Sequence, residues 1–146
     1  MKNAHSTVQE FNQSNLNRKE LIKFCFVRNP WNRIISMFHM SFKCNPIHQR
    51  KKQFKQFIMN YDIKTMEEFY AIDQKVMVDK IFKMEELSES INIINSKVKY
   101  VSNDIKLKKT KLDANYKEWL DQEMIEFIAE KEKYTLKLID YKFNLN

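Results

Sequence analysis

Residues 24–36 read FCFVRNPWNRIIS and join the end of a strand to the start of a helix. The apolar and aromatic run over 21–27 predicts a buried strand, and Asn29 with Pro30 provides the cap and first turn of a helix that ends near Lys43. In α/β folds, ligands bind where strands end and helices begin. Because a helix N-terminus offers free N–H groups to an anion, the sequence predicts an anion site at this junction.

Arg28 and Ser36 are the side chains that make the junction specific. Arg28 adds a fixed fork of donors, Ser36 adds a hydroxyl eight positions later, and Arg33 lies on a nearby face of the helix. The segment can therefore hold a phosphate without glycine, which is absent from the chain and whose absence excludes a Walker-type or dinucleotide-type loop. A structural alternative has Arg28 forming a salt bridge at the strand end and Ser36 as an ordinary helix residue.

The same segment resembles the 3′-phosphate-binding segment of sulfotransferases that use 3′-phosphoadenylyl sulfate (PAPS). It is most similar to the carbohydrate sulfotransferase branch and its small bacterial-type relatives. That family follows an aromatic strand with Val-Arg-(Asn or Asp)-Pro, an aromatic, a polar residue, Arg, two apolar residues and Ser. The resemblance implies that Arg28 and Ser36 grip the 3′-phosphate, with Asn29 and Arg33 as near neighbours. Asn32 stands where the family usually has an acidic residue.

Two later segments extend the resemblance. VDKIFKMEEL, residues 78–87, resembles the family strand that ends in an aromatic-x-Glu-x-Leu turn, with Met84 at the aromatic position. Residues 116–143 resemble its C-terminal helices, with Asp140-Tyr141 in place of Gly-Tyr. The implied fold class is α/β: a partial P-loop-like sulfotransferase core, with a small parallel sheet flanked by helices and a helix-rich C-terminal half. We expect residues 1–146 to form a single domain of this kind.

The resemblance also suggests a base and a missing part. A histidine about 23 residues before the motif arginine often serves as the family's base, and His5 has that spacing. His39 is expected to be a surface or packing residue, and His48 to lie in a basic loop. The family's 5′-phosphosulfate strand and loop precede the histidine helix by tens of residues, so we expect both to be absent here and the chain as given to be inactive. A missing N-terminal segment or a second chain would complete the sheet.

Three functions follow as hypotheses. The first is a sulfotransferase-family protein that, in its complete form, moves a sulfuryl group from PAPS to a hydroxyl of a carbohydrate-like acceptor. The second is a non-catalytic relative or fragment that binds an anion or nucleotide. The third is a nucleic-acid-binding protein built on the Lys-rich segments 49–55 and 106–111. Those runs lack interleaved aromatics or a known module, so no nucleic acid is expected.

Composition limits the remaining choices. The chain has 26 Lys plus Arg against 19 Asp plus Glu, and the net charge of +7 suits a polyanionic partner. Cys25 and Cys44 are too few for a disulfide framework, and Cys25 is expected to be a buried small hydrophobe. No metal-ligand spacing, membrane-length apolar run or signal peptide is visible. We therefore expect a soluble chain, either cytoplasmic or Golgi-associated if it belongs to a longer anchored protein.

The other elements are predicted from periodicity and capping signals. Ser6 and Thr7, each followed three residues later by Gln or Glu, predict a helix over 6–18. The expected apolar stripe of the motif helix is Trp31, Ile34, Ile35, Phe38 and Phe42. The further expectations are a basic loop at 44–52, short helices at 54–61 and 66–72, a strand at 75–83, a helix at 84–95, an irregular stretch at 97–113 with a brief strand at 98–101, and a helix over 113–139 with a break near Asp121.

Overall fold

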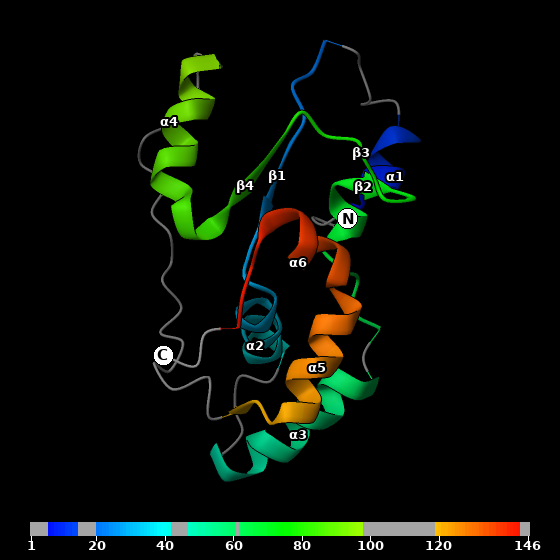
Figure 1. Ribbon diagram of the computed structural model, residues 1–146, viewed down its shortest axis with the longest axis vertical. Coiled ribbons are helices and arrows are strands. Elements are labelled where there is room, and N and C mark those ends of the chain that lie inside the picture. The colour runs from blue at the N-terminus through cyan, green and yellow to red at the C-terminus, as the bar shows by residue number, and fades with distance from the viewer. Residues whose placement is uncertain (1–5, 15–19, 42–46, 61, 98–118, 144–146) are drawn as a thin grey trace. The chain divides into compact units, whose positions relative to one another are not determined.

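The computed structural model describes residues 6–14, 20–41, 47–60, 62–97 and 119–143 (Figure 1). The chain divides into two compact units. The first comprises residues 1–28 with 64–105, and the second comprises residues 29–63 with 106–146. The division falls inside the motif, between Arg28 and Asn29. Among the described residues, no helix is both long enough and apolar enough to cross a membrane.

A two-stranded parallel sheet organises the first unit. Strand β1 (Phe24–Val27) pairs in parallel with β4 (Lys80–Lys83), so that Phe24 lies opposite Lys80 and Val27 opposite Lys83. The 3₁₀ turn η2 (Met84–Glu86) then leads into α4 (Leu87–Lys97), which packs against β4 (Figure 1). The predicted α/β class with a small parallel sheet is confirmed.

Local capping signals explain the start of the first unit. Helix α1 (Val8–Asn12) is capped by Thr7, whose Oγ1 accepts the Glu10 N–H at 3.2 Å. The Glu10 carboxylate in turn accepts the Thr7 N–H at 2.7 Å, and this backbone hydrogen bond lowers the pKa of Glu10. The helix begins where the sequence predicts, but it ends at Asn12 rather than at residue 18, and residues 15–19 lie outside the described part.

A hairpin replaces two predicted elements. The segment 66–72 forms a 3₁₀ turn, η1 (Glu67–Phe69), and the strand β2 (Ala71–Ile72) instead of a short helix. Strand β3 (Lys75–Val76) pairs antiparallel with β2 across Asp73 and Gln74, which both have positive φ (48° and 62°). Positive φ at both central residues is the requirement of a type I′ turn. The single predicted strand at 75–83 was therefore wrong: it is divided into β3 and β4, because β3 turns back onto β2.

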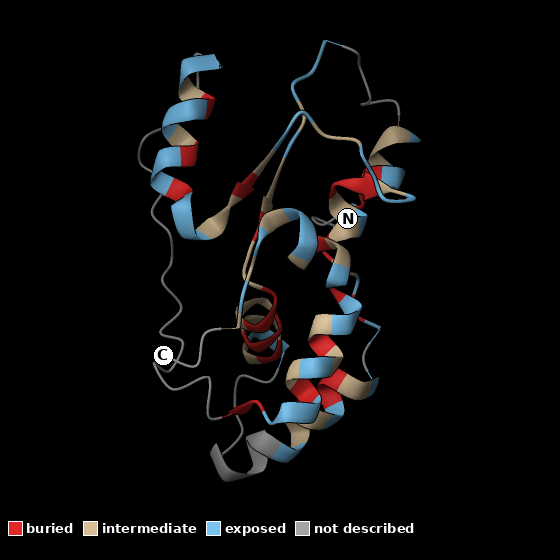
Figure 2. Ribbon diagram, in the orientation of Figure 1, coloured by how far each residue is buried: buried red, intermediate tan, exposed pale blue. Residues whose placement is uncertain are grey.

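The second unit is helical and contains an aromatic core. It comprises α2 (Pro30–Ser41), α3 (Ile47–Asn60), α5 (Gln122–Lys131) and α6 (Lys133–Ile139). Buried positions recur along α2, α3 and α5, which contact one another (Figure 2). The core residues are Trp31, Ile34, Ile35, Phe38, Phe54, Phe57, Ile58, Ile63, Trp119, Leu120, Met124 and Ile128. The predicted stripe of α2 is confirmed for its first four members, and Phe42 lies outside the described residues.

Two predictions need correction in this unit. The basic loop at 44–52 was wrong from residue 47 onward, since Ile47–Asn60 is one continuous helix. Gln, Arg and Lys have high helix propensity, so a basic composition did not indicate a loop. The described part of the predicted long helix at 113–139 begins as α5 at Gln122, with Asp121 as its N-cap, and it is interrupted at Glu132. The predicted brief strand at 98–101 and the start of that long helix, up to residue 118, lie outside the described residues.

Candidate functional site

The junction predicted to bind an anion forms as a capped helix N-terminus. The Asn29 side-chain oxygen accepts the Asn32 N–H at 3.3 Å, and its carbonyl accepts the Arg33 N–H at 2.9 Å. The Asn29 amide group also donates to the Lys142 carbonyl at 3.4 Å, which ties the cap to the chain after α6. Pro30 is buried at the first position of α2, where its missing N–H has no structural cost. The capping signal in the sequence therefore identified the start of this helix.

Arg33 is occupied by an ion pair within the second unit. Its Nη1 lies 3.1 Å from Oε1 of Glu132, and the two side chains are 15% and 4% exposed. Glu132 separates α5 from α6, so the pair joins α2 to that break. A carboxylate this deeply buried is costly unless a hydrogen-bonded cation accompanies it. Arg33 therefore has a structural partner, and a bound phosphate would have to share it.

Arg28 and Ser36 differ from Arg33 because they lack such a side-chain partner among the described residues. Arg28 follows β1 at the end of the first unit and is half-buried, and Ser36 is half-buried in α2 of the second unit. Within the described part of the chain, neither side chain forms a hydrogen bond or an ion pair. A guanidinium and a hydroxyl that the fold leaves uncommitted are the groups that could receive a phosphate.

Asn32 adds a polar atom that the sequence analysis treated only as a departure from the family pattern. It lies in the first turn of α2, and its side-chain oxygen is buried without a hydrogen-bond partner among the described residues. An unsatisfied buried acceptor costs about 1–3 kcal/mol. Among the described residues, this oxygen is therefore an unsatisfied polar atom of the motif helix.

The histidines have distinct environments. His5, the predicted base, lies outside the described residues. His39 lies on α2, where its ring packs on Trp119 with centroids 5.1 Å apart, in agreement with the predicted surface or packing role. His48 lies within α3, in a stretch whose side chains are not described. No group of three or more His, Cys, Asp or Glu among the described residues could hold a metal ion.

Cys25 lies in β1 and is half-buried. Its Sγ lies 3.5 Å from the Phe26 carbonyl, and desolvation by burial raises the pKa of the thiol to about 11. The raised pKa favours the protonated thiol at neutral pH, and Cys25 is half-buried where the sequence predicted a buried small hydrophobe.

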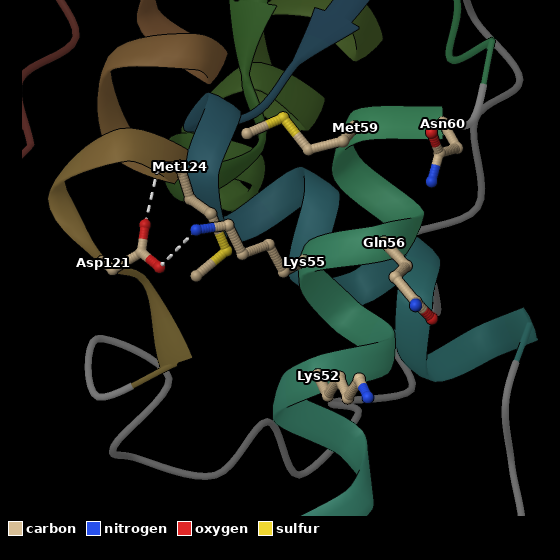
Figure 3. Close-up of a pocket in the computed structure, with 7 residues that line it drawn as sticks. All are labelled: Lys52, Lys55, Gln56, Met59, Asn60, Asp121 and Met124. Atoms are coloured by element: carbon tan, nitrogen blue, oxygen red, sulfur yellow. Dashed lines mark hydrogen bonds and ion pairs between the residues drawn. The ribbon is translucent and has the colours of Figure 1, made fainter.

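A separate cavity of about 540 Å³ lies in the second unit, between α3 and the start of α5 (Figure 3). Lys55 reaches towards Asp121, with 3.3 Å between Nζ and Oδ2, and it also pairs with Glu123. The hydrogen bonds to Glu123 and Asp121 raise the pKa of Lys55, and the one to Glu123 has the larger effect. Lys52, Gln56 and Asn60 lie along another side of α3 (Figure 3).

None of the predicted site residues lines this cavity, and its two halves are far apart in the sequence. The available signal for this cavity was helical spacing: Lys55 and Met59 share one stripe of α3, and Lys52, Gln56 and Asn60 share a neighbouring stripe. Because Lys55 is neutralised by two carboxylates, the Lys-rich run 49–55 does not present it as a free charge to nucleic acid. The second Lys-rich run, 106–111, lies outside the described residues.

Comparison with known proteins leaves the family open. No family model, curated protein sequence or solved structure matches this chain. The function must therefore be argued from the residues of the chain itself.

Proposed function

We propose that residues 28–36 bind the 3′-phosphate of an adenine nucleotide, and that the chain is a sulfotransferase-family domain that uses PAPS. The observation that carries this proposal is that the motif residues form two pairs, and that only one pair has side-chain partners among the described residues. Asn29 and Arg33 are held by partners within the second unit, whereas Arg28 and Ser36 have none among the described residues. The first pair supports the helix start, and the second pair is left for a ligand.

Each motif residue then has a definite role. Arg28 supplies the charge-assisted bonds to the phosphate, and Ser36 supplies a hydroxyl. Asn29 fixes the start of α2, whose first N–H groups favour an anion. Arg33 acts as a positioning residue, because its bond to Glu132 holds α2 against the break between α5 and α6. PAPS would supply the sulfuryl group, and His5 is the proposed base for a carbohydrate-like hydroxyl acceptor.

A second candidate function is nucleotide binding without transfer. It is favoured by one observation, the absence of glycine from the 146 residues. Loops that cradle a transferring phosphate or sulfate commonly need glycine for close backbone approach. The 3′-phosphate contacts proposed here hold the cofactor far from the reacting sulfur, so they contribute binding and orientation more than rate.

Titration calorimetry with adenosine 3′,5′-bisphosphate tests the binding proposal. A hydrogen bond to a charged group contributes about 1.5–3 kcal/mol, so Arg28→Ala should weaken binding by about tenfold or more. Lys137→Ala is the matched control, because it removes one exposed positive charge from α6, remote in sequence from the motif. Equal affinities of wild type and Arg28→Ala would remove Arg28 from the site.

A further inference from the structure

The first unit exposes apolar side chains at and before the start of β1. Leu21, Ile22 and Phe24 are 46%, 49% and 42% exposed, and Ile93 on α4 is 38% exposed. Single exposed apolar residues are ordinary, but a contiguous group is typical of an interaction surface. Ile22, Phe24 and Ile93 line one small cavity together with Phe82 of β4.

The size of this cavity limits what it can hold. Its volume is about 100 Å³, well below the roughly 300–1,000 Å³ of pockets that enclose a whole small ligand. It is large enough for part of one apolar side chain. Pockets that receive a single side chain are the usual anchor points of protein–protein interfaces.

Two lysines on the rim give the cavity a charge preference. Lys80 of β4 and Lys97 at the end of α4 both line it, and the ammonium groups of both are without an ion pair among the described residues. The lining carboxylate, Asp79, already accepts the Lys23 N–H at 2.7 Å. The rim therefore favours carboxylates on an incoming partner. We call the surface formed by Ile22, Phe24, Phe82, Ile93, Lys80 and Lys97 the α4–β4 cleft.

We propose that the α4–β4 cleft docks an acidic segment of a partner protein. One apolar side chain of that segment enters the cavity, and flanking carboxylates meet Lys80 and Lys97. Charge favours an acidic partner over a second copy of the chain, because a second copy would bring another net charge of +7 to a basic rim. The apolar lining disfavours a free phosphate or nucleotide. The proposal is independent of the phosphate site, since it uses none of the residues 28–36.

The test uses the full chain and a labelled peptide, Glu-Glu-Asp-Phe-Ile-Asp-Glu-Glu, in a fluorescence anisotropy titration. Reversing both rim charges with Lys80→Glu and Lys97→Glu should weaken binding by about tenfold or more. Ile93→Ser, at an exposed position, should weaken it by about fivefold. Lys137→Glu with Lys142→Glu is the matched control, because it makes the same charge change in the second unit. Circular dichroism of each variant checks that the fold is kept.

Further measurements distinguish an acidic partner from other possible occupants of the α4–β4 cleft. A peptide with Ser-Ser in place of Phe-Ile should bind more weakly, and about 0.5 M salt should weaken the acidic peptide through screening. The proposal is overturned if wild type does not bind the acidic peptide, if the rim variant binds as well as wild type, or if a peptide flanked by lysines binds equally. Self-association of the chain in sedimentation equilibrium that Ile93→Ser abolishes would assign the cleft to a second copy and overturn it too.

Discussion

The Arg33 guanidinium and the Glu132 carboxylate form an ion pair 3.1 Å long, in which Glu132 is 4% exposed. The pair joins the second turn of α2 to the residue that separates α5 from α6. Because Glu132 is the more buried partner, the structure depends on Arg33 being present. Arg33, which the sequence resemblance predicted to lie near a phosphate, is thus a structural residue of the second unit.

Arg33→Ala should strongly destabilise the second unit. The substitution takes the hydrogen-bonded guanidinium away from the buried Glu132 carboxylate, and breaking a buried ion pair on one side costs about 3–5 kcal/mol. Urea unfolding followed by tryptophan fluorescence measures the change, since Trp31 and Trp119 both lie in this core. The comparison variant is Lys133→Ala, whose pair with Glu130 at 2.7 Å is exposed on both sides. Its cost should be far smaller, because solvent screens an exposed ion pair. Equal losses in the two variants would contradict the structural role of Arg33.

Asp140→Gly should stabilise the chain. Asp140 follows α6 in the left-handed conformation, with φ 52° and ψ 45°. A non-glycine residue there costs about 1–2 kcal/mol, and glycine is favoured at this helix end. This is the position at which the resembled family has glycine. The exposed contact from Asp140 to Lys142, at 3.8 Å, contributes little.

Thermal unfolding of three chains checks this expectation. Asp140→Gly should unfold at a higher temperature than wild type. Asp140→Ala removes the same carboxylate but keeps a Cβ atom in the left-handed conformation, so its unfolding temperature should not rise. A gain of the same size in both variants would show that charge, and not backbone conformation, controls the position.

The Cys25 thiol should react slowly with iodoacetamide at neutral pH. A Cys44→Ser background leaves one thiol, and its alkylation rate should rise with a midpoint near pH 11 in the folded chain. In urea the midpoint should return to about the ordinary value of 9.0. Because burial raises the pKa, the protonated thiol stabilises the fold fully below about pH 9. That contribution is lost as the pH rises towards 11. A folded midpoint near 9 would mean that Cys25 is not desolvated.

Short-range signals were read correctly from the sequence because their cause is local. The Thr7–Glu10 capping box and the Asn29–Pro30 helix start each depend on residues within one turn, and both form. The hairpin at Asp73 and Gln74 was missed because type I′ turns usually contain glycine or asparagine, and this chain uses neither there. The parallel pairing of β1 with β4 agrees with the small parallel sheet that the α/β pattern predicted.

Long-range partners could not be predicted from a single sequence. Arg33 and Glu132 are separated by 99 positions, and Lys55 and Asp121 by 66. Each charge has many candidates of opposite sign along the chain, and no local pattern selects one. Only the structure could therefore distinguish Arg33, which has an ion-pair partner, from Arg28, which has none among the described residues. Spacing alone treated both as neighbours of a phosphate.

The most direct test of the central claim compares two nucleotides on two chains. Adenosine 3′,5′-bisphosphate carries the 3′-phosphate that Arg28 is proposed to bind, whereas adenosine 5′-monophosphate lacks it. Calorimetry should show that wild type prefers the bisphosphate by about tenfold or more, and that Arg28→Ala loses this preference while its affinity for the monophosphate stays nearly unchanged. An undiminished preference in Arg28→Ala, or no preference in wild type, would contradict a 3′-phosphate site at Arg28.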